Sequence, residues 1–416
     1  MTPTQLAPRG KATQEIVLAF SGGLDTSWCV AWLRHEQRAR VTTVTVDTGG
    51  FSNGELETIA ARSRALGAEE HFTVGAKKSY FDEVLRFLIF GNVLRGHSYP
   101  ICVGAERVLQ AREVARVAHE IGASAVAHGS TAAGNDQVRF EIALRALGPE
   151  LEILAPVRDS APSRAQELEY LSARGYAAAA KSGDYSINTG LWGLTIGGKE
   201  THSTDLALPE AAWVRTHGAF DAPRAPTRIR IDFRHGVPCA LNAEELAPVA
   251  LIEKLDSLAA SFGIGRGIHL GDTILGIKGR VAFEAPAATV LISAHRELEK
   301  LTLSLCQQRT KDSLAQVYGD LIHEGRFLEP ACRDVEAFLQ SSQLRVSGSV
   351  VALLRPGQVF IEGVTSPHSL VAASRAVYGE AAGEWRAADA AGFARIRALP
   401  DVLYQRAGAA VEAVQT

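Results

Sequence analysis

A short apolar run at residues 16–20 (IVLAF) leads directly into a loop of glycines, hydroxyl groups and one acid, residues 21–27 (SGGLDTS). The glycines let the backbone turn tightly and present its N–H groups, and a helix that follows directs its positive N-terminus towards bound phosphates. Such a loop belongs at the carboxyl end of a parallel strand, so it predicts an α/β fold that binds ATP. It contains no lysine, which excludes a GxxxxGK[ST] loop. A strand-to-helix turn that binds nothing is the alternative.

Short apolar runs alternate with helical patterns through the first half of the chain. Strands are expected at 16–20, 41–47, 124–128 and 151–156, and helices at about 25–37, 53–65, 78–95 and 104–121. This alternation predicts a doubly wound parallel sheet, which binds its ligands at the carboxyl ends of its strands. Because the 21–27 loop and Gly129 each follow a predicted strand, we expect them to meet at one site.

The regular alternation is lost from about Lys181. We predict a disordered tail over 1–14, a nucleotide-binding domain over 15–180, a mixed α+β domain over 181–384 and a C-terminal arm with a helix over 385–416. Within the mixed domain we expect strands at 228–233 and near 267–294, a long helix at about 296–320 and a hairpin over 346–361. The last segment is rich in alanine, so a frayed terminus is the alternative to an extended arm.

Charge and cysteine content narrow the class of partner. A net charge of −3 gives no electrostatic reason to expect nucleic acid or an anionic membrane, and it favours small charged metabolites. The five cysteines are widely separated, so they predict neither a disulfide framework nor a zinc site, and they fit a reducing cytoplasm. No stretch approaches the roughly 18 apolar residues that would span a membrane.

A second polar segment follows the strand expected at 124–128. Residues 127–140 (AHGSTAAGNDQVRF) place glycines, hydroxyls, amides, an acid and an arginine together. On a helix that begins near Asn135, the side chains of Asn135, Asp136 and Arg139 share one face. Arg139 is suited to bind a carboxylate, and Asn135 and Asp136 are suited to orient an amine. The alternative is a glycine-rich turn with a helix cap and an exposed ion pair.

Together these motifs resemble argininosuccinate synthase, of the PP-loop ATP pyrophosphatase class. The resemblance runs over about residues 14–405 and rests on SGGLDTS, GNDQVRF, the Tyr99 segment, Ala155-Pro156 with Arg158, and the segments 184–187, 191–193, 263–276 and 278–280. Enzymes of that family use ATP and Mg²⁺ to adenylate the ureido oxygen of citrulline, and the amine of aspartate then displaces AMP. The resemblance also implies a cytoplasmic homotetramer to which the C-terminal helix contributes.

Matched position by position, the resemblance implies three groups of site residues. The ATP contacts fall on Ala19, Phe20, Ser21, Gly22, Gly23, Leu24, Asp25, Thr26, Ser27, Val46 and Gly129. The aspartate contacts fall on Thr131, Asn135 and Asp136. The acceptor contacts fall on Tyr99, Gly104, Arg107, Asn135, Arg139, Ser186, Thr195, Gly271 and Phe283. The catalytic roles fall on Asp25, Asp136 and Arg139, and no metal ligand is predicted among the side chains.

The acceptor group departs from the family at several positions. Gly104 and Thr195 stand where serine is usual, Phe283 replaces tyrosine, and Gly197 and Gly271 replace glutamates that face the α-ammonium of citrulline. Hydrogen bonds to charged groups contribute roughly 1.5–3 kcal/mol each, so losing two would weaken citrulline binding by about 3–6 kcal/mol.

These departures predict a modified ureido or amide acceptor, in specialised metabolism. The first alternative is citrulline itself, with a carboxylate restored by Glu106, Glu200 or Asp272. A PP-loop RNA-modifying enzyme or a non-catalytic binding protein is the second alternative.

Overall fold

The computed structural model describes residues 14–177 and 185–415, and it separates into two compact units, one ending at Ser366 and one beginning at Pro367. Apart from Gln14, the predicted tail at 1–14 lies outside the described residues, and so does the predicted boundary at 180/181. In residues 14–177 and 185–415, no helix is both long enough and apolar enough to cross a membrane.

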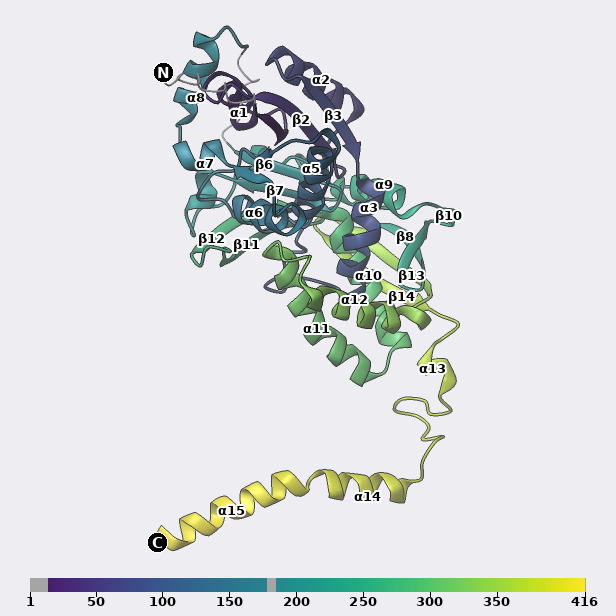
Figure 1. Ribbon diagram of the computed structural model, residues 1–416. Coiled ribbons are helices and arrows are strands. Elements are labelled where there is room, and N and C mark those ends of the chain that lie inside the picture. The colour runs from purple at the N-terminus through teal and green to yellow at the C-terminus, as the bar shows by residue number, and fades with distance from the viewer. Residues whose placement is uncertain (1–13, 178–184, 416) are drawn as a thin grey trace, which may run out of the picture. The chain divides into compact units, whose positions relative to one another are not determined.

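A five-stranded parallel sheet with the strand order β3-β2-β1-β4-β5 organises the first half of the chain. Figure 1 labels two of its strands, β2 and β3. Its strands are β1 (Glu15–Ala19), β2 (Arg40–Asp47), β3 (Glu70–Gly75), β4 (Ala125–Ala127) and β5 (Glu152–Leu154). The chain order reverses at β1, which pairs with β2 on one side and β4 on the other. The predicted α/β class and doubly wound sheet are confirmed, and the reversal places a ligand crevice beside the end of β1.

Alternate residues of β1 pack into different cores, because successive side chains of a strand point to opposite faces. Val17 belongs to a core shared with α5 (Arg107–Ile121), whereas Ile16 and Leu18 belong to one shared with α1 (Leu24–His35) and Leu171 of α8 (Arg164–Ala173). The other helices of this half are α2 (Asn53–Ala65), α3 (Lys77–Tyr80), η1 (Phe81–Leu85, a π-helix), α4 (Arg86–Phe90), α6 (Asn135–Leu147) and α7 (Pro156–Ser160). Helices therefore cover both faces of the sheet, and the tip of β1 is fixed from both sides.

Two antiparallel sheets follow in the second half of the first unit. One has the order β10-β9-β8-β13-β14, from β8 (Thr227–Arg234), β9 (Val237–Leu241), β10 (Glu244–Glu245), β13 (Gly348–Arg355) and β14 (Gln358–Thr365). The other has the order β11-β12-β7-β6, from β6 (Ser186–Gly190), β7 (Gly193–Gly197), β11 (Arg266–Asp272) and β12 (Lys278–Glu284). The predicted hairpin at 346–361 is confirmed by β13 and β14.

The helices of this half differ from the prediction. They are α9 (Pro248–Ala260), α10 (Pro286–Thr302), α11 (Leu305–His323) and α12 (Pro330–Ser342), with short 3₁₀ turns η2 (Lys199–His202), η3 (Glu210–Ala212) and η4 (Gln343–Arg345). The strand expected up to 294 is wrong because α10 already begins at Pro286, a residue suited to the first helical turn. The single helix at 296–320 is also wrong. Ser304 and Gln307 form a capping box that starts α11 as a new helix.

The second unit contains α13 (Leu370–Ala373), α14 (Ala387–Arg397) and α15 (Leu399–Gln415). The chain from Ala387 to Gln415 is therefore helical over almost its whole length. Apolar side chains of this unit are exposed, among them Tyr378, Phe393, Ile396, Leu403 and Tyr404.

Candidate active site

A cavity of about 920 Å³ lies in the first unit, at the carboxyl ends of β1, β2 and β4, and extends to residues of β6, β7, β11 and β12. The predicted site residues that line it are Ala19, Phe20, Ser21, Gly23, Leu24, Asp25, Thr26, Val46, Tyr99, Arg107, Gly129, Thr131, Asn135, Asp136, Arg139, Ser186, Thr195 and Gly271. Gly22, Ser27, Gly104 and Phe283 do not line it. The cavity thus joins the loop after β1 to the polar segment after β4, as the sequence predicted.

The nucleotide half of the cavity is the part lined by residues 19–26, Val46 and Gly129. Gly23 precedes the first turn of α1, and the hydroxyls of Ser21 and Thr26 lie 3.2 Å apart beside it. The helix N-terminus and these hydroxyls together offer donors to a phosphate. Ser27 faces the other way: its Oγ donates to Gly23 O at 2.6 Å and accepts from Arg62 Nε at 2.8 Å, and its side chain is buried.

Glu167 of α8 adds a carboxyl group that the sequence motifs did not single out. It is 2% exposed, and its burial together with the neighbouring Asp25 carboxylate raises the pKa of Glu167 to about 7. A carboxyl that is only partly ionised near neutral pH adds less negative charge beside the loop after β1. No local motif marks Glu167, because α8 reaches the loop only through the fold.

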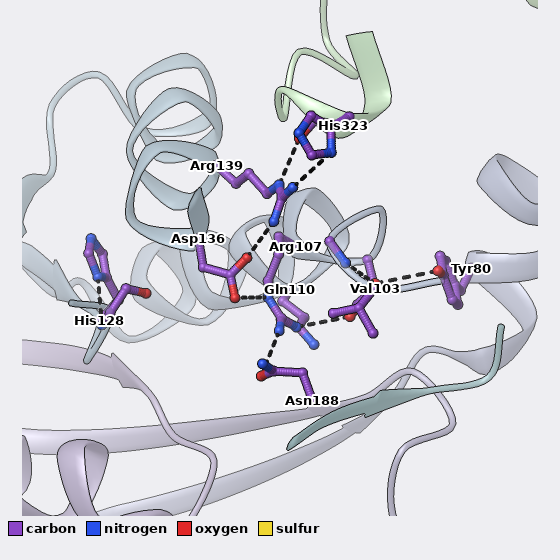
Figure 2. A network of polar contacts seen from close by, with 12 residues as sticks. Tyr80, Val103, Arg107, Gln110, His128, Asp136, Arg139, Asn188 and His323 are labelled. Atoms are coloured by element: carbon purple, nitrogen blue, oxygen red, sulfur yellow. Dashed lines mark hydrogen bonds and ion pairs between the residues drawn. The ribbon is translucent and has the colours of Figure 1, made fainter. Parts of the chain in front are cut away.

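Asp136 lies at the centre of a polar network (Figure 2). Its carboxylate accepts from Arg107 Nε at 2.9 Å and from Arg139 Nη1 at 2.7 Å, at the first turn of α6, which begins at Asn135 as predicted. Burial alone would raise the pKa of Asp136, but the two guanidinium groups outweigh it and hold that pKa well below its usual range. Asp136 is therefore a permanent negative charge. Asn135 Oδ1 accepts from Ile274 N at 3.0 Å, which ties α6 to the turn between β11 and β12.

Arg107 is held in place by a buried carboxylate. Its Nη1 donates to Glu106 Oε1 at 3.0 Å and its Nη2 to Asn188 Oδ1 at 3.3 Å. Glu106 is 1% exposed and also accepts from Gly104 N at 3.0 Å and Tyr80 Oη at 3.4 Å. Because its oxygens are already bonded, Glu106 is not free to bind the ammonium group of an acceptor, which removes one of the three carboxylates considered from the sequence.

The other two carboxylates are also engaged. Glu200 accepts from Tyr185 Oη at 2.6 Å and is not among the residues that line the cavity. Asp272 pairs with Lys278 at 2.6 Å, and its side chain is 60% exposed. Asp272 does line the cavity, so of the three carboxylates it is the one that remains at the acceptor half, held by the pair with Lys278.

Side chains from other elements occupy the space beside Gly104 and Gly271, two glycines that the sequence assigned to the acceptor. The acceptor half is the part of the cavity lined by Tyr99, Arg107, Asp136, Arg139, Ser186, Thr195, His269, Gly271 and His323. Gly104 has a φ of +103°, and a Cβ there would lie 2.7 Å from Arg139 Cζ. A Cβ at Gly271 would lie 2.5 Å from His269 Nε2. The guanidinium of Arg139 and the imidazole of His269 thus occupy the room that side chains at these two positions would need.

His269 was missed by the sequence motifs, although it shares a strand face with Gly271 at a spacing of two residues. Its ring stacks on Tyr99 with the centroids 5.3 Å apart, and Tyr99 also contacts the ring of Phe283 at 5.1 Å. Burial lowers the pKa of His269, with a further contribution from Arg95. A neutral imidazole therefore forms this part of the surface of the acceptor half. Gly197 remains open, with Ser186 O the nearest atom at 4.0 Å.

His128 ends β4 and lines the cavity without acting on a neighbour as a base. Its ring stacks on Phe140 at 5.5 Å, and its Nδ1 accepts from Ser130 N at 3.3 Å. Burial lowers the pKa of His128 to about 4, so the ring is neutral at physiological pH. The stacking and the contact with Ser130 fit a structural role, and the buried Nε2 has no hydrogen-bond partner among the described residues.

Both halves of the chain match domains of known proteins. Residues 15–177 match the arginosuccinate synthase N-terminal HUP domain, and residues 185–404 match the arginosuccinate synthase C-terminal domain. The argininosuccinate synthase of Xylella fastidiosa is 38% identical over 94% of this chain and 98% of its own length. That of Methanocaldococcus jannaschii is 36% identical over 94% of this chain and 97% of its own length, and that of Limosilactobacillus reuteri is 37% identical over 94% and 95%.

Proposed function

Because the chain belongs to the argininosuccinate synthase family of ATP-dependent carbon–nitrogen ligases, we propose that it joins L-citrulline to L-aspartate and releases AMP and pyrophosphate. The observation that carries this proposal is the cavity of about 920 Å³, which joins the loop after β1 to Asn135, Asp136 and Arg139. Relatives that carry the name argininosuccinate synthase match nearly the whole chain, which favours citrulline over the modified acceptor inferred from the sequence.

The filled glycines support citrulline for a physical reason. The argument for a modified acceptor treated Gly104 and Gly271 as lost polar groups. Arg139 and His269 occupy those volumes, so polar atoms remain in the acceptor half, supplied by other elements. The neutral imidazole of His269 can accept a hydrogen bond from an ammonium group, as a carboxylate does, although without its charge.

The chemistry then divides between the two halves of the cavity. The ureido oxygen of citrulline attacks the α-phosphorus of ATP, pyrophosphate leaves, and the AMP-linked carbon becomes open to attack by the amine of aspartate. Bond formation to that nitrogen expels AMP, and the amine loses its proton. Asp136 is too weak a base to take a proton early, because its pKa is held low, so its role is to orient the amine.

Arg139 and the loop after β1 hold the two charged partners of this reaction. The remaining N–H groups of Arg139 bind the carboxylate of the acceptor, and the N–H groups at the start of α1 bind the phosphates. Thr131 and Asn135 complete the contacts to aspartate. Each of these residues lines the cavity.

Mg²⁺ is part of the proposal as an ion that accompanies ATP. Mg²⁺ usually keeps several waters and binds through substrate phosphates with one or two carboxylates. Asp25 lines the cavity at the first turn of α1, which suits a single carboxylate contact. Within residues 14–177 and 185–415, no group of three or more His, Cys, Asp or Glu side chains could hold a metal, so the phosphates would supply most of its ligands.

Assembly into a homotetramer is proposed from the second unit. Its helices expose large apolar side chains, including Phe393 at 69% and Ile396 at 70% exposed, on a segment of 50 residues that forms its own compact unit. Contact with other copies of the chain would cover them. Light scattering of the purified protein measures the assembly directly.

Pyrophosphate release with ATP, aspartate and citrulline tests the proposed reaction, with the product identified by mass spectrometry. We expect argininosuccinate at a rate typical of metabolic enzymes. Turnover of another ureido compound by a protein that does not turn over citrulline would instead favour the modified acceptor. That outcome would agree with the open space at Gly197, where no carboxylate side chain stands.

A further inference from the structure

His323 ends α11 and lines the acceptor half of the cavity, far in sequence from the motifs after β1 and β4. It is 7% exposed. Its carbonyl oxygen accepts from Arg139 Nε at 2.8 Å, and its Nδ1 lies 3.3 Å from Arg139 Nη2 (Figure 2). The end of α11 thus contacts the guanidinium on the side opposite Asp136.

The contact with Arg139 fixes which nitrogen of His323 carries the proton. A guanidinium can only donate, so Nδ1 must accept. Burial, Arg139 and Arg95 lower the pKa of His323 to about 3, so the ring is neutral and its one proton is on Nε2. His323 therefore presents Nε2–H as a donor.

This donor has no hydrogen-bond partner among the residues that the structure describes, and the atom is buried. Leaving a buried donor unpaired costs about 1–3 kcal/mol, and buried polar groups are rarely left so. Arg139 also keeps N–H groups beyond those bonded to Asp136 and His323. The two side chains together offer only donors, in surroundings made more positive by Arg95, which is a surface for a carboxylate.

We propose that His323 binds the acceptor: Nδ1 orients Arg139, and Nε2–H donates to the carboxylate that Arg139 also binds. This rests on the proposed function, because the acceptor is taken to be citrulline. A carboxylate oxygen placed between Nε2 and the free edge of Arg139 would pair the buried donor and neutralise part of the positive charge.

Substitutions at His323 separate its two contacts. His323→Ala removes both, and we expect the KM for citrulline to rise about 10- to 100-fold, with KM for ATP and aspartate changed less than about twofold. His323→Gln places an amide donor near the position of Nε2, whereas His323→Asn places an acceptor near that of Nδ1. Recovery of citrulline binding by Gln more than by Asn is the expected result. The opposite order would reduce His323 to a residue that positions Arg139 and would overturn the direct contact.

A truncated acceptor gives the second readout. 4-Ureidobutylamine is citrulline without its carboxylate, so it cannot use Nε2–H. We expect His323→Ala to lower kcat/KM for citrulline but to change it for 4-ureidobutylamine less than about threefold. Equal losses with both compounds would show a general disturbance of the cavity and contradict the proposal.

The surface variant His119→Ala is the matched control, since that imidazole pairs with Glu150 at 2.5 Å outside the cavity. We expect its kinetics to equal those of the parent chain. Absence of citrulline turnover by the parent chain would contradict the proposed function itself. Normal citrulline turnover by the parent chain, with no effect of any His323 variant, would contradict only the role of His323.

Discussion

Two buried polar networks in the first unit differ in how completely their atoms are paired. The closed network consists of Asn92, His295, Glu299, Lys311 and Gln343, and the cavity network consists of Arg107, Asp136, Arg139 and His323. In the closed network Glu299 bonds to Lys311 Nζ at 3.0 Å, Asn92 Nδ2 at 2.6 Å and Gln343 Nε2 at 2.8 Å.

The two histidines make the contrast clear. Both ring nitrogens of His295 have partners, Asn92 Oδ1 at 2.7 Å and Gln343 Oε1 at 2.9 Å. His323 has a partner at Nδ1 only, and its buried Nε2 has none among the described residues. A network whose atoms are all paired can only hold helices together, whereas unpaired donors at a cavity have capacity left for a ligand. The comparison predicts that damage to one network lowers stability and damage to the other lowers activity.

Asp136→Asn is expected to have the largest effect. The change removes the charge between Arg107 and Arg139 and the group that orients the amine, so kcat should fall about 10³- to 10⁴-fold. ATP binding should change less than about threefold, because the loop after β1 is untouched. Pyrophosphate release and equilibrium ATP binding measure the two quantities.

Asp232→Asn provides the control for a lost carboxylate, since Asp232 pairs with Arg230 at 2.8 Å and does not line the cavity. Its kinetics should match those of the parent chain. Turnover by Asp136→Asn within about tenfold of the parent would remove the amine-orienting role assigned to the cavity network.

Glu299→Ala tests the closed network. Lys311 is 0% exposed, and loss of Glu299 leaves its buried ammonium with only the longer contact to Asp312 at 3.7 Å and the carbonyl oxygen of Phe90 at 3.1 Å. The free energy of unfolding should therefore drop by about 3–5 kcal/mol. The KM values of the folded protein should stay within about twofold of the parent. Denaturant unfolding followed by steady-state kinetics separates stability from activity.

The exposed pair Arg228–Glu362 serves as the reference for Glu299→Ala. Glu362→Ala removes a surface ion pair at 2.6 Å and should cost less than about 1 kcal/mol. If Glu299→Ala cost no more than Glu362→Ala, the closed network would not be a stabilising element. A raised KM for citrulline in folded Glu299→Ala would erase the distinction between the networks.

Local signals were enough to predict the elements that carry the nucleotide half and α6. The loop at 21–27 and the string at 134–140 each combine glycines with a helix start, and such signals depend on neighbours in sequence. The apolar run in α10 was assigned to a strand because a short apolar run fits a buried strand and a buried helix equally well.

The acceptor half was harder to predict because side chains from distant segments occupy the space beside the glycines assigned to the acceptor. Gly104 and Gly271 show which side chains are absent at those positions, but only the fold shows that Arg139 and His269 occupy the space. His323 comes from α11, and nothing in its local sequence points to Arg139. Contacts between distant segments decide the acceptor site, and single positions compared one by one do not reveal them.

Gly271→Glu tests whether the side chain of His269 occupies the space beside Gly271 in the cavity. From the sequence, a glutamate here should favour citrulline. In the structure its Cβ would lie 2.5 Å from His269 Nε2, so the ring must leave its stack on Tyr99. Overpacking of this kind costs about 1–3 kcal/mol, and we expect the KM for citrulline to rise about tenfold. The double variant Gly271→Glu/His269→Ala makes room for the new side chain, so its KM for citrulline should return towards that of the parent chain. A lower KM for citrulline in Gly271→Glu alone would contradict this geometry.

The smallest effect is expected within the loop after β1, where the buried hydroxyl of Ser27 differs from that of Thr26, which lines the cavity. Ser27 Oγ is fully engaged by Gly23 O and Arg62 Nε, so Ser27→Ala should cost about 1–2 kcal/mol of stability and change KM for ATP less than about twofold. Thr26 lines the cavity, and Thr26→Ala should instead raise KM for ATP about fivefold with little loss of stability. Thermal unfolding and ATP kinetics of the two variants form a matched pair. An exchange of these outcomes would mean that contact with the cavity does not distinguish structural from ligand-binding groups in this loop.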